Sequence, residues 1–505
     1  MKQHIISTIL FVFLFSFEAG SQLQTTYRAE TFGSVATGEN TPFWMLYHNW
    51  GMVPLDADNF YVRGGVFHQQ TINKDWSFNA GFDLAGSSPH AYSNNVWVQQ
   101  LYGEVNWKSL RLNIGAKEDY ISLLNPYLSS GDFALSNNAR PLPEIKGSIP
   151  EFILVPYTKG NMYIKGHFAV GYYLDGKWQE ETARPHNRNY TKDILSHHKS
   201  IYFRFGNIEK KNKLQFTLGL NHQAQWGGEL YKYQYVKETK QREYVVQNQP
   251  QGLDDLFRVA IAKEGSPSSS GADTAYVAGS SIGAYLFKFD YRLKNNTVLS
   301  LYKQHFFEDG SGLGFENYRD GLYGFEYKSQ KKSALSGVVF EYIYTKHQGG
   351  PIHLQMLPEF DPGFPNRADG NDSYYNNCDY LQGPTYFGRT KGTPLFLSPE
   401  YNKDGNINFK SSRIISWHLG VEGYLLPTLQ YRLLATTGQS WGLYYFPFTS
   451  VKKGFASGLD LIYSCPKVQD LDLKLSLGFN KGDFFSSDTF GGGITIAKRG
   501  IIFKK

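Results

Sequence analysis

The sequence has few cysteines and methionines and almost no long apolar run. Only two Cys, Cys378 and Cys465, occur in 505 residues, too few for a disulfide scaffold in an exported chain of this size. Beyond the N-terminus no stretch is apolar enough for a transmembrane helix. Five Met stand against 37 Phe and 36 Tyr, with 51 Gly. This composition is typical of sheets and turns and argues against a helical bundle.

The N-terminus has the pattern of an export signal. Lys2 and His4 precede the apolar run Ile5 to Phe17, and Ala19-Gly20-Ser21 supplies small residues for cleavage. The run is about 13 residues long, against the roughly 20 that a membrane-spanning helix needs. We therefore expect residues 1–21 to be a signal peptide and residues 22–505 to form one domain.

Much of the remaining chain alternates apolar and polar residues. Trp76, Phe78, Ala80, Phe82 and Leu84 share one face of an extended segment, with Ser77, Asn79, Gly81 and Asp83 on the other. This period of two predicts half-buried strands. Candidate strands start near Tyr27, Asn59, Trp76, Asn95, Leu110, Phe152, Met162, Ser200, Leu214, Ser280, Thr297, Gly321, Leu335, Ile414, Leu429, Leu459, Leu471 and Gly492.

The connections between these strands alternate in length. Every second one is short, such as Lys108-Ser109, whereas the others are longer, with long loops at about 118–151, 223–279 and 345–413. Soluble sandwiches and propellers do not predict this alternation, but bacterial outer-membrane barrels do, with an even number of strands. The sequence therefore predicts an all-β fold: a transmembrane antiparallel β-barrel of about 18 strands in a Gram-negative outer membrane. We expect its long extracellular loops to plug the lumen in part.

Two further features make structural predictions. Leu253, Leu256 and Phe257 recur at helical spacing and predict a short helix folded over or into the barrel mouth. Cys378 lies in the seventh outside loop and Cys465 at the opposite end of a strand. Because the membrane thickness separates these positions, we predict no bond between them.

Several strings in loops and at strand ends resemble the capsule assembly Wzi family. They are Ser136-Asn137-Asn138-Ala139-Arg140-Pro141-Leu142-Pro143, the stretch 219–228 (GLNHQAQWGG), 305–312 (HFFEDGSG) with Asp320-Gly321-Leu322, and 371–377 (NDSYYNN) followed by Gly388 and Gly392-Thr393-Pro394-Leu395. The resemblance runs from Tyr27 to the C-terminus. It implies an 18-stranded outer-membrane barrel that acts as a lectin for capsular polysaccharide.

Sugar-binding sites need flat aromatic rings beside carboxylates, amides and guanidinium groups. The candidate polysaccharide-binding residues are Trp226, His222, Asn138, Arg140, Glu308, Asp309, Asn371, Asp372, Tyr374 and Arg389. A competing interpretation is that these polar groups satisfy one another inside the barrel, for example Arg140 or Arg389 with Glu308 or Asp309.

The sequence gives little support for catalysis or metal binding. Gly279-Ser280-Ser281-Ile282-Gly283 matches the G-x-S-x-G pattern, but it opens a strand and lacks the tight turn into a helix that a nucleophile elbow needs. His197-His198 and Asp404-Gly405-Asn406 lack further ligands at metal-site spacing. We therefore expect no catalytic residue, no metal and no cofactor.

The leading hypothesis is a non-enzymatic barrel that binds capsular or extracellular polysaccharide and helps to assemble or retain it at the cell surface. A porin or sugar channel is the alternative, and a barrel hydrolase with Ser and His on adjacent lipid-facing strands comes third. The net charge of +6 fits contact with acidic polysaccharide or with lipopolysaccharide phosphates in the outer-membrane lipid. Nucleic acid is excluded as a partner, and we expect a monomer.

Overall fold

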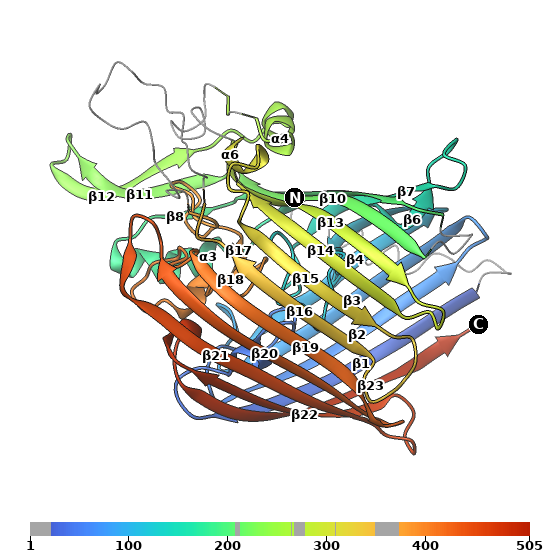
Figure 1. Ribbon diagram of the computed structural model, residues 1–505. Helices are drawn as coiled ribbons and strands as arrows, with labels where there is room; N and C mark the ends of the chain where they lie inside the picture. The colour runs from blue at the N-terminus through green and yellow to red at the C-terminus, as the bar shows by residue number, and fades with distance from the viewer. Residues whose placement is uncertain (1–21, 208–212, 264, 267–277, 309, 349–372) are drawn as a thin grey trace.

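The computed structural model describes residues 22–207, 213–263, 265–266, 278–308, 310–348 and 373–505. Eighteen antiparallel strands form one closed barrel (Figure 1). It closes because the first strand, β1 (Gln22–Ala36), pairs with β2 (Asn59–Thr71) on one side and with the last strand, β23 (Thr489–Lys504), on the other. The predicted fold class and strand number are confirmed.

The other barrel strands follow one another around the wall in chain order. They are β3 (Trp76–Ser88), β4 (Val96–Trp107), β5 (Leu110–Ala116), β6 (Glu144–Leu154), β7 (Met162–Tyr172), β9 (Leu195–Phe205), β10 (Leu214–Trp226), β13 (Ser280–Arg292), β14 (Val298–Phe307), β15 (Gly321–Lys328), β16 (Gly337–Tyr344), β19 (Ile414–Leu426), β20 (Leu429–Gly442), β21 (Pro447–Ser464) and β22 (Leu471–Lys481). No helix among the described residues has the length and apolarity needed to cross a membrane.

The two ends of the barrel differ. One end, here called the turn end, holds the short connections and both ends of the barrel chain; the other, the loop end, holds the long connections. The predicted alternation of lengths holds for most connections, but the connection between β20 and β21, residues 443–446 at the loop end, is as short as those at the turn end. The loops carry α2 (Phe43–Leu46), α3 (Gly176–Ala183), η1 (Arg184–His186), β8 (Tyr190–Lys192), β11 (Glu229–Val236), β12 (Gln241–Asn248), α4 (Leu253–Ala260), α6 (Gly310–Leu313), β17 (Thr385–Tyr386), β18 (Arg389–Thr390), η2 (Pro399–Tyr401) and η3 (Asp483–Phe485).

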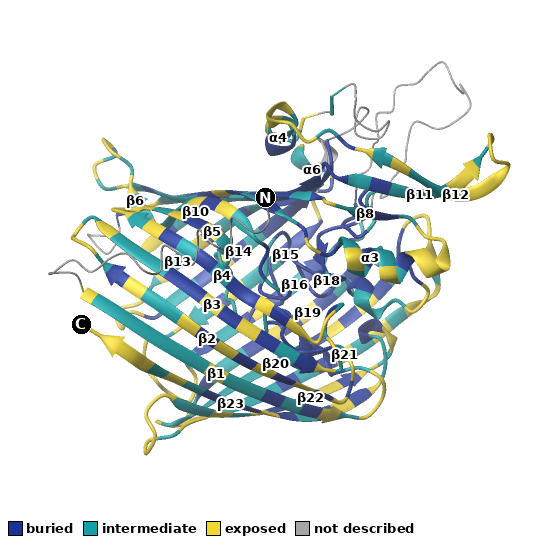
Figure 2. Ribbon diagram, turned by 180° about the vertical axis from the view of Figure 1, so that it is seen from behind, coloured by how far each residue is buried: buried dark blue, intermediate teal, exposed yellow. Residues whose placement is uncertain are grey.

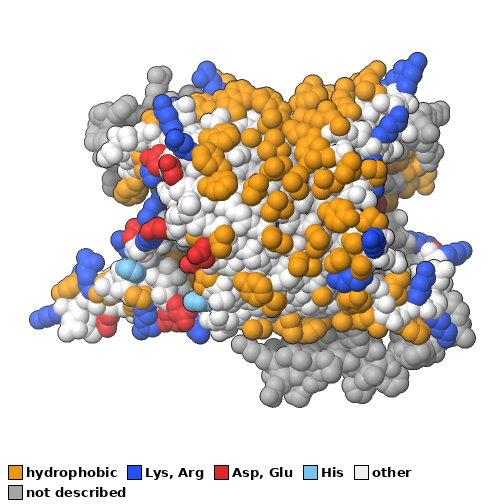
Figure 3. All heavy atoms as spheres, turned by 90° about the horizontal axis from the view of Figure 1, so that it is seen from below, with side chains coloured by type: hydrophobic (Ala, Val, Ile, Leu, Met, Phe, Trp, Pro, Cys, Tyr) orange, Lys and Arg blue, Asp and Glu red, His pale blue; other side chains and the backbone are white. Residues whose placement is uncertain are grey.

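Side chains alternate between the lumen and the outer wall. On β13, Lys288 is buried in the lumen while its neighbours on the strand, such as Phe289, are exposed on the outside. Burial alternates along the strands in Figure 2, and apolar side chains gather on the outer wall in Figure 3. A sheet with an apolar outer face and a polar inner face is stable in lipid only when it closes into a barrel, because closure pairs the backbone N–H and C=O groups of its edge strands.

Two predicted strand starts are wrong by most of a strand. β6 begins at Glu144 instead of Phe152, and β21 begins at Pro447 instead of Leu459. Pro150 interrupts the β6 pattern, and the register between β6 and β7 shifts between Ile149 and Ile153, where proline is tolerated as a bulge residue. In the early part of β21, the apolar residues Phe448 and Val451 fall on opposite faces, so no alternation marks it.

The predicted helix exists as α4, but it does not lie over or in the mouth. It packs on β9 and β10, with Val259 in one apolar cluster with Ala224 and Trp226 (Figure 1). Gln223 donates to the carbonyl of Ala134, a loop residue inside the barrel. Because neighbouring side chains on a strand point to opposite faces, Ala224 and Trp226 point outward. α4 therefore covers the outside of the wall.

The structure also places the two cysteines. Cys378 lies in the loop between β16 and β19, at the loop end, and Cys465 lies in the turn after β21, at the turn end. The predicted separation by the height of the barrel is confirmed.

Candidate functional site

The lumen near the loop end is filled by a plug, which we define as residues 117–143, α2 and residues 373–413. Phe133 is fully buried at its centre. Its ring stacks on that of Phe306 from β14, with centroids 4.0 Å apart and planes at 11°, and it also contacts the rings of Tyr375 and Phe396. Interiors packed this closely leave few voids larger than a water molecule.

Buried polar groups fix the plug to the wall. Glu341 on β16 accepts hydrogen bonds from the Ser129 hydroxyl at 2.7 Å, the Ser130 amide at 2.7 Å and the Tyr302 hydroxyl at 2.6 Å. Asp132 accepts from Gln304 on β14 at 2.7 Å, and burial raises the pKa of its carboxyl. Satisfied polar networks of this kind specify one arrangement of a loop.

Beyond the barrel, at the loop end, β8, β11 and β12 form a separate three-stranded sheet (Figure 1). It carries a group of aromatic side chains that we call the tyrosine row: Tyr190, Tyr231, Tyr233, Tyr235 and Tyr244. The rings of Tyr190 and Tyr231 stack at 4.7 Å and 8°, and those of Tyr233 and Tyr244 lie 5.2 Å apart. Tyr190 is buried, Tyr231, Tyr233 and Tyr244 are half-buried, and Tyr235 is 57% exposed.

Charged groups of both signs flank the tyrosine row. Lys192 lies 5.0 Å from the centroid of the Tyr231 ring and pairs with Glu180 at 2.6 Å. The guanidinium of Arg184 lies 5.5 Å from the centroid of the Tyr244 ring. The hydrogen bond from Tyr231 to Glu229 raises the pKa of Tyr231 to about 12, so the hydroxyl stays a donor at neutral pH. The row thus offers flat apolar faces beside hydrogen-bonding groups, the two features that sugars require.

Three of the predicted site residues are buried in the plug or its supports. Asn138 accepts from the His48 amide at 3.1 Å and donates to the Gly392 carbonyl at 2.8 Å. The Tyr374 hydroxyl donates to Asp320 at 2.8 Å. Arg389 forms a bidentate pair with Glu400, donating from Nε to Oε1 and from Nη2 to Oε2. Each of these side chains has internal hydrogen-bond partners, so each holds the loops in place.

Two others, His222 and Trp226, point outward from the β10 wall. Trp226 is 4% exposed beneath α4. His222 alternates with the inward-facing Gln223 and lies across from Gly283 on β13. Ser281, on the same outer face, is the serine of the G-x-S-x-G string, which opens β13 as expected. Within the described residues neither ring nitrogen of His222 nor the Ser281 hydroxyl has a hydrogen-bond partner, so no nucleophile–base pair is formed.

The remaining predicted residues divide by position. Arg140 is half-buried, donates to the Val98 carbonyl at 2.5 Å and lies over the Tyr92 ring. Glu308 accepts from the Tyr375 amide. Asp309, Asn371 and Asp372 lie outside the described residues. The interpretation that Arg140 or Arg389 pairs with Glu308 or Asp309 is wrong for the described partners, because Arg389 pairs with Glu400 and Arg140 with a carbonyl oxygen. Sugar contacts by the predicted residues stay a prediction.

The tyrosine row was not predicted from the sequence. Its signal was present as Tyr231-Lys232-Tyr233-Gln234-Tyr235, a strict alternation inside the predicted loop 223–279. Across the described residues, no cluster of three or more His, Cys, Asp or Glu is arranged to hold a metal ion.

No protein-family model matches the chain, and no curated protein matches it. Among solved structures, Wzi of Escherichia coli, titled an outer membrane protein involved in group 1 capsule assembly and a carbohydrate-binding β-barrel, has a TM-score of 0.54 at 12% identity, covering 93% of this chain and 83% of that one. OccK5 (OpdH) of Pseudomonas aeruginosa has a TM-score of 0.47 at 8% identity, covering 95% and 98%. The expected likeness to the Wzi barrel is confirmed at the level of the fold.

Proposed function

We propose that the protein is an outer-membrane barrel that binds capsular or extracellular polysaccharide at its loop end and helps to retain it on the cell surface. The turn end then faces the periplasm, because barrels of this class have short periplasmic turns and long outside loops. The observation that carries the proposal is the tyrosine row, which stands outside the barrel at the loop end, beyond the plug. A surface of stacked, partly exposed rings suits a ligand that stays outside.

The same arrangement argues against a porin. An open lumen would need water along its whole length, whereas Phe133 and its neighbours fill the loop-end half. Single-channel recording in planar bilayers tests this point: we expect small currents or none, and large, stable openings would favour the channel. We also propose that the protein is not an enzyme, since Ser281 and His222 are buried and not hydrogen-bonded to each other.

The binding experiment uses the full chain, purified in a neutral detergent, and polysaccharides extracted from the producing cell. Tyr233→Ala and Tyr235→Ala are compared with the parent protein. Tyr157→Ala is the matched control, because Tyr157 is a fully exposed tyrosine in a connection at the turn end. Stacking of one ring on a sugar face contributes on the order of 1 kcal/mol, so each row variant should bind about fivefold more weakly.

Saturable binding that weakens in the row variants and is unchanged in Tyr157→Ala supports the proposal. The proposal fails if no extracted glycan binds, or if all three variants bind as the parent does. Trp226→Ala is a useful fourth variant. If this substitution weakens sugar binding, the site includes the outer wall beneath α4.

A further inference from the structure

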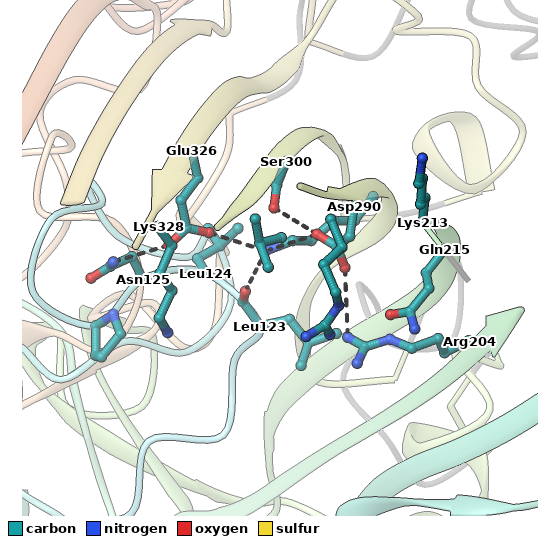
Figure 4. Close-up of a pocket in the computed structure, with 14 residues that line it drawn as sticks. Leu123, Leu124, Asn125, Arg204, Lys213, Gln215, Asp290, Ser300, Glu326 and Lys328 are labelled. Carbon is teal, nitrogen blue, oxygen red and sulfur yellow. Dashed lines mark hydrogen bonds and ion pairs between the residues drawn. The ribbon is translucent and has the colours of Figure 1, made fainter. Parts of the chain in front are cut away.

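Beneath the plug, the turn-end half of the lumen contains a cavity of about 230 Å³ that we call the basic cavity (Figure 4). Its wall comes from five consecutive barrel strands, β9, β10, β13, β14 and β15, and Leu123, Leu124, Asn125 and Pro126 of the plug form its other side. The cavity is open to solvent on one side. It is smaller than the roughly 300–1,000 Å³ of a pocket for a drug-sized ligand, so its size suits a single sugar unit or a small anion.

The lining of this cavity is rich in positive charge. Five cationic side chains line it, against two carboxylates, those of Asp290 and Glu326. The cations are Arg204, Lys213, Lys288, Arg292 and Lys328. A low-dielectric barrel wall around a cluster of one sign concentrates its field in the opening and raises the local concentration of counter-ions.

The two carboxylates are already paired. Glu326 accepts from Lys288 at 3.3 Å and from Asn125 at 3.1 Å. Asp290 accepts from Ser300 at 2.6 Å and lies 3.9 Å from Arg204. Within the described residues, the side chains of Lys213, Arg292 and Lys328 form no ion pair. The uncompensated positive charge therefore lies at the open side of the cavity.

Two of these cations lie on barrel strands and line the cavity, unlike the lysines in the neighbouring turns. Arg292 and Lys328 both lie opposite Val298 of β14, on its two neighbouring strands, so the two cations share one face of the sheet. Lys294 and Lys331, in the connections just beyond, are exposed and do not line the cavity. A guanidinium and an ammonium on one concave wall can hold a single anion between them.

We propose that the basic cavity is an anion-binding site, entered from the turn end, for the carboxylate or phosphate group of an acidic sugar unit. Because the plug separates the cavity from the loop end, this site is distinct from the tyrosine row and does not depend on it. In the orientation proposed above, ligands would reach this site from the periplasm. The protein would then contact acidic glycan on both sides of the membrane.

The test is isothermal titration of the full chain in a neutral detergent. Tetragalacturonate supplies the carboxylate, inorganic pyrophosphate supplies the phosphate, and maltotetraose is the neutral comparison. The variant Arg292→Gln with Lys328→Gln removes two cavity cations, and Lys294→Gln with Lys331→Gln removes the same charge just outside. We expect the cavity variant to bind about tenfold more weakly and the control variant to match the parent. Binding by the parent should weaken as NaCl is raised from 50 to 500 mM.

The three ligands separate the sources of the anion. Binding of tetragalacturonate alone assigns the cavity to carboxylate sugars, and binding of pyrophosphate alone assigns it to phosphate. The proposal is overturned if neither anion binds, if maltotetraose binds as tightly, or if the control variant loses as much affinity as the cavity variant. Tyr235→Ala should leave these titrations unchanged, so failure here and failure of the tyrosine-row experiment are told apart.

Discussion

The two halves of the lumen have the same strand pattern but opposite contents. In the loop-end half, inward-facing side chains such as Glu341 accept hydrogen bonds from loop residues, and the ring of Phe133 is buried among those loops. In the turn-end half, inward-facing groups such as Arg292 meet an open cavity. Alternation along a strand therefore sets which face is polar, whereas the loops decide whether that polar face is dry and packed or wet and accessible.

This difference assigns separate tasks to the two halves. On the proposals above, the packed half gives the tyrosine row a fixed base, since residues held in a close-packed interior have little freedom to move. The wet half keeps its charges in a solvated space where a ligand can reach them. Substitutions should therefore affect unfolding strongly in the first half and weakly in the second.

The largest expected effect is for Phe133→Ala. Removing a fully buried aromatic ring leaves a cavity, so the free energy of unfolding should fall by about 3–5 kcal/mol. Guanidinium unfolding in detergent, followed by tryptophan fluorescence, measures the loss. Phe446→Ala is the control, because Phe446 is 76% exposed in the connection between β20 and β21 at the loop end, and it should change stability by less than about 0.5 kcal/mol. Equal losses would show that the loop-end half is not a packed core.

A pH effect of comparable size should come from Asp320. Burial raises the pKa of its carboxyl to about 7, whereas the same group titrates near 4 in an unfolded chain. The folded state therefore binds the extra proton, and its contribution to stability is present below about pH 4 and is lost as pH rises toward 7, by roughly 2–4 kcal/mol. Unfolding of the parent and of Asp320→Asn at pH 4, 5.5 and 8 checks this. The variant should lack that decline, and parallel profiles would contradict the prediction.

Replacing a glutamate by glutamine in each half of the lumen should give effects of intermediate size. Glu341→Gln leaves the Ser130 amide or its hydroxyl facing an amide donor in a dry interior, so it should lower stability by about 1–3 kcal/mol. Glu326→Gln affects a buried side chain that lines the basic cavity. Water in the cavity can replace part of the lost contact, so the loss should be smaller, about 0.5–1 kcal/mol. Thermal unfolding of both variants under one condition compares them. A larger loss for Glu326→Gln would reverse the comparison.

The smallest expected effect is for Lys328→Gln. The side chain is exposed at the rim of the basic cavity, and stability should change by less than about 0.5 kcal/mol in either direction. The measurement is the same guanidinium titration, with Lys331→Gln as the neighbour outside the cavity. A loss above 1 kcal/mol in Lys328→Gln alone would mean that the wet half contributes to folding as the packed half does.

The strands were predictable because their signal is local. A lipid-facing wall requires an apolar residue at every second position, as in 76–84, whatever the rest of the chain does. Where the alternation is interrupted, as at Pro150 in β6 and at the start of β21, the predicted strand boundaries were wrong. The helix at 253–261 was recognised from its own spacing, but its place on the outer wall depends on Trp226, which is distant in sequence.

The candidate sites were less predictable because they depend on pairing between distant residues. Nothing in the sequence indicates that Arg389 pairs with Glu400, or that Asn138 supports Gly392. Only the register shows that Arg292 and Lys328, on different strands, both lie opposite Val298. The tyrosine row had a local signal, the period of two at 231–235, but nothing in the sequence shows that these strands form a sheet outside the barrel.

The seam between β1 and β23 constrains how the protein assembles. Gln24 pairs with Lys504 and Ala36 with Gly491. The first strand of the barrel therefore cannot complete its pairing until the last strand has been synthesised. Pairing between residues so far apart in the chain is entropically costly and slow. Until it happens, two bare sheet edges are available for pairing with other chains. A chain that stops before residue 489 would keep those edges open permanently and should aggregate or be degraded instead of inserting.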